Sequence, residues 1–96
     1  MLHQLRIYRI EDEKFEAFLY LWTAAIPKLR QAMGWKVQAW AVPDKSEFVW
    51  ILSRDCTPAE WEEKEKEYHS SPERLALNPD PGQYLVGREH RWIEPL

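Results

Sequence analysis

The sequence predicts an α+β domain with a four-stranded antiparallel sheet and two main helices, in the order βαββαβ. Side chains alternate as in β-strands at residues 2–10, 34–42, 47–54 and 83–93. A long amphipathic helix separates the first two strands, and a charged helix separates the last two. A chain of 96 residues has no room for a second hydrophobic core, so residues 1–96 are expected to form a single domain.

The first strand, residues 2–10, has two chemically different faces. Leu5 and Ile7 lie on one side of it, whereas Arg6 and Tyr8 lie on the other. Three acidic residues follow the strand and favour a helix start, because carboxylates interact well with the positive end of a helix dipole.

The first helix is predicted from about residue 12 to residue 33. Pro27 should bend this helix without ending it, since its ring removes one backbone hydrogen bond. Gly34 is expected to end the helix in a left-handed conformation. One continuous apolar stripe anchors the helix and comprises Phe15, Phe18, Leu19, Trp22, Ile26, Leu29 and Met33.

Residues 34–54 form a hairpin that turns at residues 43–46. Both of its faces carry large apolar side chains, for example Ile51 on one and Trp50 on the other. An antiparallel sheet commonly buries one face and exposes the other to water, so a second apolar face needs its own cover. With 45% hydrophobic residues and six tryptophans, the chain is therefore predicted to form a homodimer. The alternative is that several tryptophans are half-exposed, which is common for this residue.

The second helix begins with three agreeing signals. Thr57 can cap it, Pro58 suits its first turn, and Glu60 completes a capping box. The helix should reach about residue 68 and lie on the surface, because most of its residues are charged. A short helix and a proline-rich loop then lead to the last strand. The few residues expected to be buried in the second helix are Ala59, Trp61 and Tyr68.

The same alternation assigns the two faces of the sheet. We expect the aliphatic face to pack under the helices and the mixed face to be uncovered. Aromatic side chains combined with hydrogen-bonding groups are typical of a cavity or an interface. The aliphatic face comprises Leu5, Ile7, Val37, Ala39, Val49, Ile51, Leu85 and Gly87, and the mixed face comprises Arg6, Tyr8, Gln38, Trp40, Phe48, Trp50, Arg88, His90 and Trp92.

Several stretches of the chain resemble the NIPSNAP family. They are LRIYRI at residues 5–10, PKLRQAMGWKV at 27–37, EFVWILS at 47–53, and Trp61 and Tyr68 with SPER at 71–74. That family belongs to the dimeric α/β-barrel superfamily, which also includes antibiotic-biosynthesis monooxygenases. The resemblance implies a ferredoxin-like fold in which two sheets pack face to face into a barrel. It also implies a pocket for a small molecule on the uncovered face of each sheet.

The haem-degrading members of this superfamily use an Asn on the first strand with a Trp and a His further on. No Asn occurs in residues 2–10, and the spacing of Trp61 and His69 does not match that pattern. Haem degradation is therefore not expected.

Arg6 and Tyr8 are the first candidates for ligand contacts. A guanidinium offers paired planar donors and a phenol offers a hydroxyl, so the pair could orient a carbonyl, enolate or carboxylate group. His90 is the predicted proton-transfer group, because imidazole titrates near neutral pH. Alternatively, Arg6 and Tyr8 pack at the dimer seam and His90 pairs with a carboxylate of the second subunit. The predicted ligand-binding residues are Arg6, Tyr8, Gln38, Trp40, Trp50 and Arg88, with His90 as the catalytic residue.

Two other reactive residues are interpreted as structural. His69 could act as an acid or base at a pocket mouth, but a histidine at a helix C-terminus also complements the helix dipole, which we favour. Cys56 has no base beside it in sequence. Neither residue therefore enters the predicted site.

Composition argues against several kinds of partner. The net charge is −3 and the basic residues are scattered, so neither nucleic acid nor a membrane surface is expected to bind. A single cysteine rules out an internal disulfide or a cysteine-based zinc site, and no metal or cofactor motif occurs. The N-terminal segment resembles neither a signal peptide nor a transmembrane span, so a cytoplasmic protein is expected.

Two classes of function remain open. One is a cofactor-independent oxygenase, isomerase or cyclase that acts on an aromatic or carbonyl-bearing metabolite. The other is a non-catalytic dimer that binds a metabolite or serves as an accessory subunit. The sequence contains no nucleophile motif or phosphate-binding loop that decides between them.

Overall fold

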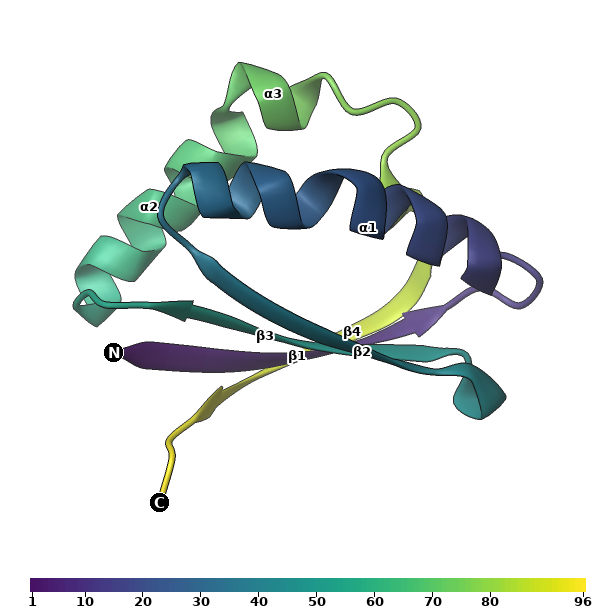
Figure 1. Cartoon of the computed structure of the whole chain (residues 1–96), viewed down its shortest axis with the longest axis horizontal. Coiled ribbons are helices and arrows are strands. Elements are labelled where there is room, and N and C mark those ends of the chain that lie inside the picture. Colours follow the sequence, from purple (N-terminus) through teal and green to yellow (C-terminus); the bar gives the residue numbers. More distant parts are fainter.

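The computed structural model describes residues 1–96 and shows a four-stranded antiparallel sheet with its helices on one side (Figure 1). The strand order β2-β3-β1-β4 places the first and third strands at the centre of the sheet. This arrangement confirms the predicted α+β, ferredoxin-like fold class. The helices and strands are β1 (Leu2–Ile10), α1 (Phe15–Ala32), β2 (Lys36–Val42), β3 (Glu47–Arg54), α2 (Pro58–Ser70), α3 (Pro72–Leu75) and β4 (Leu85–Ile93).

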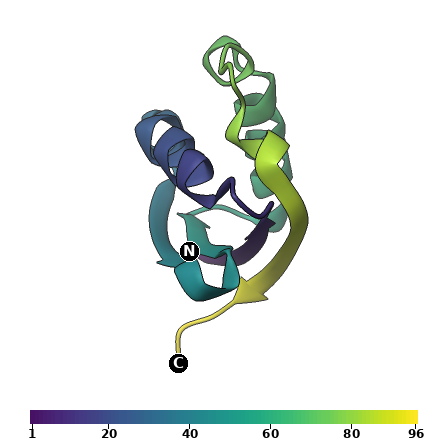
Figure 2. The same cartoon turned by 90° about the vertical axis from the view of Figure 1, so that its right-hand side faces the viewer.

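The helices α1 and α2 lie side by side over the same face of the curved sheet (Figure 2). The C-terminus leaves from the opposite side of the sheet (Figure 2). Two short 3₁₀ turns complete the chain: η1 (Pro43–Lys45) joins β2 to β3, and η2 (Pro81–Tyr84) precedes β4. None of the helices has the length and apolar character needed to cross a membrane.

The first helix, α1, continues through Pro27 as one helix, as predicted. It starts three residues later than expected, since Glu13 adopts a positive φ of 70° in the turn before it. Gly34 has a φ of +90°, the left-handed conformation that glycine adopts at low cost, and it ends the helix as predicted. The fully buried residues of α1 recur at every fourth position and are Phe18, Trp22, Ile26 and Arg30.

The start of α2 follows its sequence signals closely. Thr57 Oγ1 accepts a hydrogen bond from the Glu60 backbone N–H at 3.2 Å, and Glu60 Oε1 accepts one from the Thr57 backbone N–H at 2.9 Å. This reciprocal pair is the predicted capping box. Trp61 and Tyr68 are buried as expected, whereas Ala59 is exposed, which corrects the third predicted contact.

The assignment of the sheet faces from the sequence is wrong. The helices cover the mixed face: Phe48 and Trp50 are 3% and 2% exposed. Their neighbours Val49 and Ile51, on the aliphatic face, are only half-buried. The face expected to be open is therefore the main core of the domain, and the aliphatic face is the open one.

Ring packing explains why the mixed face is the covered one. Phe48 packs edge to face against Phe18 and Trp22 of α1, with ring centroids 5.1 and 4.6 Å apart. Aromatic side chains bury more apolar area than Val or Ile, and edge-to-face pairs add further stabilisation. A helix whose own buried stripe is aromatic therefore packs best against the aromatic face of the sheet.

The two faces of β2 are also exchanged relative to the sequence prediction, which places Gln38 and Trp40 on the same face as Trp50. Its register pairs Ala39 with Trp50 and Trp40 with Val49, so Ala39 lies on the helix side of the sheet, although exposed, and Trp40 lies on the open face. Gln38 pairs with Ile51 and lies on the open face as well. Trp40 is 53% exposed there. The relative register of two strands is set by their pairing, and a shift of one residue exchanges the faces.

The strand β4 pairs Arg88 with Tyr8 and His90 with Arg6, so both residues lie on the helix-covered face. The register shifts between Arg9 and Ile10, where Leu85 pairs with Ile10. This irregularity brings Leu85 to the helix side, away from the aliphatic face to which alternation assigned it.

Candidate functional site

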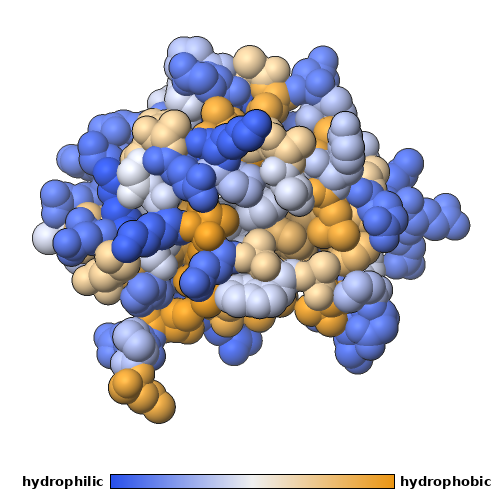
Figure 3. Space-filling model, in the orientation of Figure 1, coloured by the Kyte–Doolittle hydropathy of each residue, from blue (hydrophilic) through white to orange (hydrophobic).

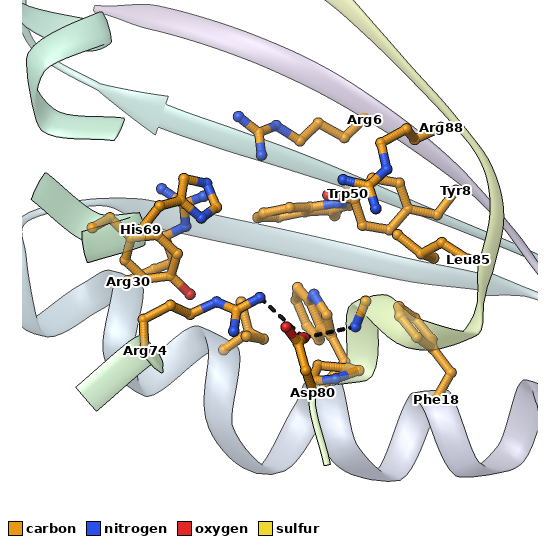
Figure 4. A pocket seen from close by; sticks show the side chains of 15 residues that line it. Arg6, Tyr8, Phe18, Arg30, Trp50, His69, Arg74, Asp80, Leu85 and Arg88 are labelled. Carbon is orange, nitrogen blue, oxygen red and sulfur yellow. Dashed lines mark hydrogen bonds and ion pairs between the residues drawn. The ribbon is translucent and has the colours of Figure 1, made fainter. Parts of the chain in front are cut away.

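A cavity of about 320 Å³ lies between the mixed face of the sheet and the helices (Figure 4). This volume falls near the lower end of the ~300–1,000 Å³ range of small-molecule pockets. One wall is formed by the central strands β1 and β3 together with β4. The residues from these strands that line it include Arg6, Tyr8, Trp50 and Arg88.

The other walls come from the helices and from the loop before β4. The helix α1 contributes its buried stripe, from Phe18 to Arg30. The end of α2, the short helix α3 and η2 close the third side. The polar residues that line this third side are Tyr68, His69, Arg74 and Asp80.

Four aromatic rings in the walls of the cavity pack edge to face against one another, and each is buried. Trp50 packs edge to face against Tyr8 and Trp22, with centroids 5.9 and 5.4 Å apart. Tyr8 also meets Phe18 at 6.4 Å. These four rings come from β1, β3 and α1, so they are held by the packing of the core itself.

A partly buried carboxylate, Glu65 of α2, joins two arginines of the cavity wall. Its Oε2 lies 2.7 Å from Nη2 of Arg6, and its Oε1 pairs with Nη1 of Arg30. Gln4 Oε1 accepts a hydrogen bond from Nε of Arg6 at 2.8 Å. Arg6 and Arg30 are 4% and 1% exposed, so this is an ion-pair network within the core.

The charge state of Glu65 follows from its partners. Burial alone would raise the pKa of its carboxyl, because desolvation disfavours the charged form. Contact with His69 and the charges of Arg30 and Arg6 outweigh burial and hold this pKa far below its ordinary value. Glu65 is therefore ionised at neutral pH and neutralises one of the two guanidinium charges.

Arg30 is enclosed by aromatic rings as well as by Glu65. Its guanidinium carbon lies 3.6 Å from the ring centroid of Tyr68 and 5.0 Å from that of Trp35. Burial lowers the pKa of Arg30, while the neighbouring Glu65 carboxylate opposes that effect. Burial also raises the pKa of the Tyr68 hydroxyl, so this group is neutral at physiological pH.

His69 lines the cavity and is exposed to solvent at its mouth. The sequence analysis considers this position for His69 but favours a structural role at the end of the helix. Its Nε2 lies 3.7 Å from Oε2 of Glu65, beyond direct hydrogen-bond distance. The side chain is 55% exposed. The imidazole of His69 is therefore in contact with both the solvent and the cavity.

A second ion pair lies at the rim of the cavity. Arg74 Nη2 is 3.1 Å from Oδ1 of Asp80, and the same oxygen accepts a hydrogen bond from the backbone N–H of Gly82 at 2.8 Å (Figure 4). Burial tends to raise the pKa of Asp80, but the Gly82 N–H and Arg74 lower it overall. This pair links α3 to η2 across the rim.

The structure brings together some of the predicted site residues and separates others. Gln38 and Trp40 lie on the opposite face of the sheet. His90 lies on the helix-covered face, paired with Arg6 in register, but it does not line the cavity. Burial and the charge of Arg6 lower the pKa of His90. Four predicted ligand-binding residues line the cavity, namely Arg6, Tyr8, Trp50 and Arg88.

Sequence reasoning missed the charged residues contributed by the helices. Arg30 continues the four-residue spacing of the buried stripe of α1, and this spacing was a usable signal. Glu65 lies between the buried Trp61 and Tyr68 at helical spacing, which places it on the inner face of α2. Asp80 carries no comparable sequence signal, because it lies in a loop.

The molecular surface mixes apolar and charged areas. In the view of Figure 3, apolar patches occur across the middle of the molecule and along its lower margin, among hydrophilic groups. No three His, Cys, Asp or Glu side chains are grouped in a way that could hold a metal ion.

Comparison with known proteins relates this architecture to solved structures. A NIPSNAP domain protein from Burkholderia xenovorans superposes with a TM-score of 0.84 at 19% identity, over 100% of this chain and 95% of that one. A NIPSNAP family protein from Agrobacterium tumefaciens gives 0.83 at 15% identity, over 99% and 92%. The chain has the NIPSNAP domain fold.

The resemblance to NIPSNAP proteins inferred from the sequence is therefore confirmed for the fold. An antibiotic biosynthesis monooxygenase has the same architecture, with a TM-score of 0.72 at 14% identity over 100% of this chain and 99% of that one. No protein-family model matches the sequence, and no curated protein matches it. At these identities, the likeness to NIPSNAP domains and to the monooxygenase concerns the fold.

Proposed function

We propose that this NIPSNAP-like protein binds a small aromatic or carbonyl-bearing metabolite in the cavity beneath its helices. The observation that carries the proposal is the combination of aromatic rings and arginines around one preformed space. Tyr8, Phe18, Trp22 and Trp50 form the aromatic part of the wall, and three of the four arginines pair with Glu65 or Asp80. The site therefore favours a ligand with a flat apolar part and an electron-rich oxygen.

We propose further that, if the protein is an enzyme, it is a cofactor-independent oxygenase, isomerase or cyclase. The shared fold of a protein described as an antibiotic biosynthesis monooxygenase supports this class. His69 is the better candidate for proton transfer than His90, because it lines the cavity and lies beside Glu65. The alternative is a non-catalytic metabolite-binding or accessory protein, which needs the cavity but no proton-transfer group.

We propose that the open face of the sheet is covered by a second copy of the chain, giving a homodimer. Leu5, Ile7, Val49 and Ile51 are only half-buried on this face, and Trp40 is 53% exposed. A contiguous apolar sheet face of this kind is rarely left in water. In such a dimer each subunit keeps its own cavity, since the cavity lies on the other side of the sheet.

The first experiment looks for the ligand directly. Native mass spectrometry of gently purified protein should reveal a co-purifying small molecule. Aromatic ketones, quinones and short acyl acids should then be titrated while following the fluorescence of Trp22 and Trp50, which line the cavity. Binding without turnover favours the non-catalytic alternative. Absence of any bound or binding compound would contradict the proposed function.

A matched pair of variants locates the binding. Ile26→Phe places a larger side chain in the wall of the cavity, whereas Ala17→Phe adds the same group on the exposed side of α1. Overpacking costs ~1–3 kcal/mol, so thermal unfolding should be measured for both variants. Ile26→Phe should weaken binding and Ala17→Phe should not. Equal binding in both variants would place the ligand elsewhere.

A further inference from the structure

The four arginines around the cavity differ in how far their charges are neutralised. Arg6 and Arg30 share the carboxylate of Glu65, and Arg74 pairs with Asp80. Arg88 forms no ion pair and no side-chain hydrogen bond within the chain. It is the one cavity arginine whose guanidinium has neither a carboxylate nor a hydrogen-bond partner in the chain, and its side chain is exposed.

The position of Arg88 is suited to holding a ligand. It projects from β4 on the cavity side of the sheet, directly opposite Tyr8 in the register. Its guanidinium carbon lies 6.0 Å from the Tyr8 ring centroid, and Figure 4 shows it beside Tyr8 and Trp50. The guanidinium of Arg88 therefore lies beside the aromatic part of the cavity wall.

We propose that the cavity binds an aromatic carboxylate, with the carboxylate on Arg88 and the ring on the Tyr8–Trp50 surface. This inference rests on the proposed binding function and specifies the chemical class of the ligand. A guanidinium presents a planar pair of donors that matches the two oxygens of a carboxylate. The small volume of the cavity favours one or two aromatic rings.

The test compares an acid with a neutral molecule of similar shape. We expect 1-naphthoate to bind wild-type protein at least ~10-fold more tightly than 1-naphthamide, since only the acid can form a charge-assisted pair with the Arg88 guanidinium. Benzoate and benzamide serve as a smaller pair. The affinity for each acid should fall as salt is raised, and the affinity for each amide should not. Calorimetry and tryptophan fluorescence give the dissociation constants.

The variant Arg88→Gln removes the free cation and keeps a side chain of comparable length. It should reduce the naphthoate affinity ~10-fold or more and change the naphthamide affinity little. The matched control is Arg91→Gln, on the same strand but on the open face and paired with Glu89. That variant should bind both compounds as wild type does.

The outcomes separate this inference from the proposed function. If the amides bind as tightly as the acids, or if Arg88→Gln weakens both equally, the carboxylate assignment is wrong while the aromatic pocket stands. If no compound of either pair binds, both the inference and the proposed aromatic pocket are contradicted.

Discussion

The two faces of the sheet show how differently one strand can be used on its two sides. Beneath the helices, Trp50 is 2% exposed and Arg6 is 4% exposed, beside the partly buried carboxylate of Glu65. On the open face, Ile51 is half-buried and Trp40 is 53% exposed. Charged groups thus lie on the covered face, where Arg6 and Glu65 form an ion pair, while apolar groups lie on the open face. This difference is the basis of our two proposals, namely a ligand beneath the helices and a second copy of the chain on the open face.

The largest expected effect comes from breaking the ion-pair network of the covered face. Glu65→Ala leaves Arg6 and Arg30 buried without a carboxylate, and loss of one partner of a buried pair costs ~3–5 kcal/mol. Urea unfolding measures the change. Glu62→Ala, on the exposed side of the same helix, is the control and should stay within ~0.5 kcal/mol of wild type. A similar decrease in the free energy of unfolding in both variants would show that the ion-pair network contributes no more to stability than an exposed glutamate does.

The open face can be tested by placing a charge on it. Ile51→Lys should weaken the proposed dimer at least ~100-fold, because a lysine without a partner resists burial in an apolar interface. Sedimentation velocity of wild type should give about twice the 11.6 kDa chain mass, and the variant should sediment as a monomer. Ligand binding should persist in the monomer. A wild-type monomer would exclude the homodimer, and loss of ligand binding on dissociation would connect the two faces.

The pH dependence of stability sharpens the account of the covered face. The pKa of Glu65 is lower in the folded protein than the ~4.3 of a Glu in an unfolded chain. The ionised carboxylate therefore makes its full contribution to the free energy of unfolding when the pH is above ~4.3. The contribution is lost as pH falls toward the folded pKa. The stability difference between wild type and Glu65→Gln should therefore be constant from pH 7 to about pH 5 and shrink by ~1–2 kcal/mol by pH 3. An unchanged difference at pH 3 would mean that the folded pKa is not lowered.

Local signals in the sequence predicted the elements of the fold well. The capping box at Thr57 and the left-handed Gly34 depend on residues close in the chain, and both occur as expected. The passage of α1 through Pro27 also follows from its local apolar pattern. These features could be predicted because each depends on a few neighbouring positions.

Contacts between residues far apart in the sequence, and the choice of which sheet face the helices cover, could not be predicted in the same way. Arg6 and Glu65 are 59 residues apart, and only the packing of α2 on the sheet brings them together. The alternation along β2 separates Trp40 from Ala39, but it does not say which of them faces the helices. The choice of the covered face depends on how well the rings of α1 pack against Phe48 and Trp50, which no single strand reveals.

The central claim is that the ligand binds beneath the helices and not on the open face. The indole N–H signals of the tryptophans in a ¹⁵N-labelled sample test this most directly, with each signal assigned from a Trp→Phe variant. Addition of 1-naphthoate should shift the signals of Trp22 and Trp50, which line the cavity, and leave that of Trp40 unchanged. A shift of the Trp40 signal, with those of Trp22 and Trp50 unmoved, would contradict the account.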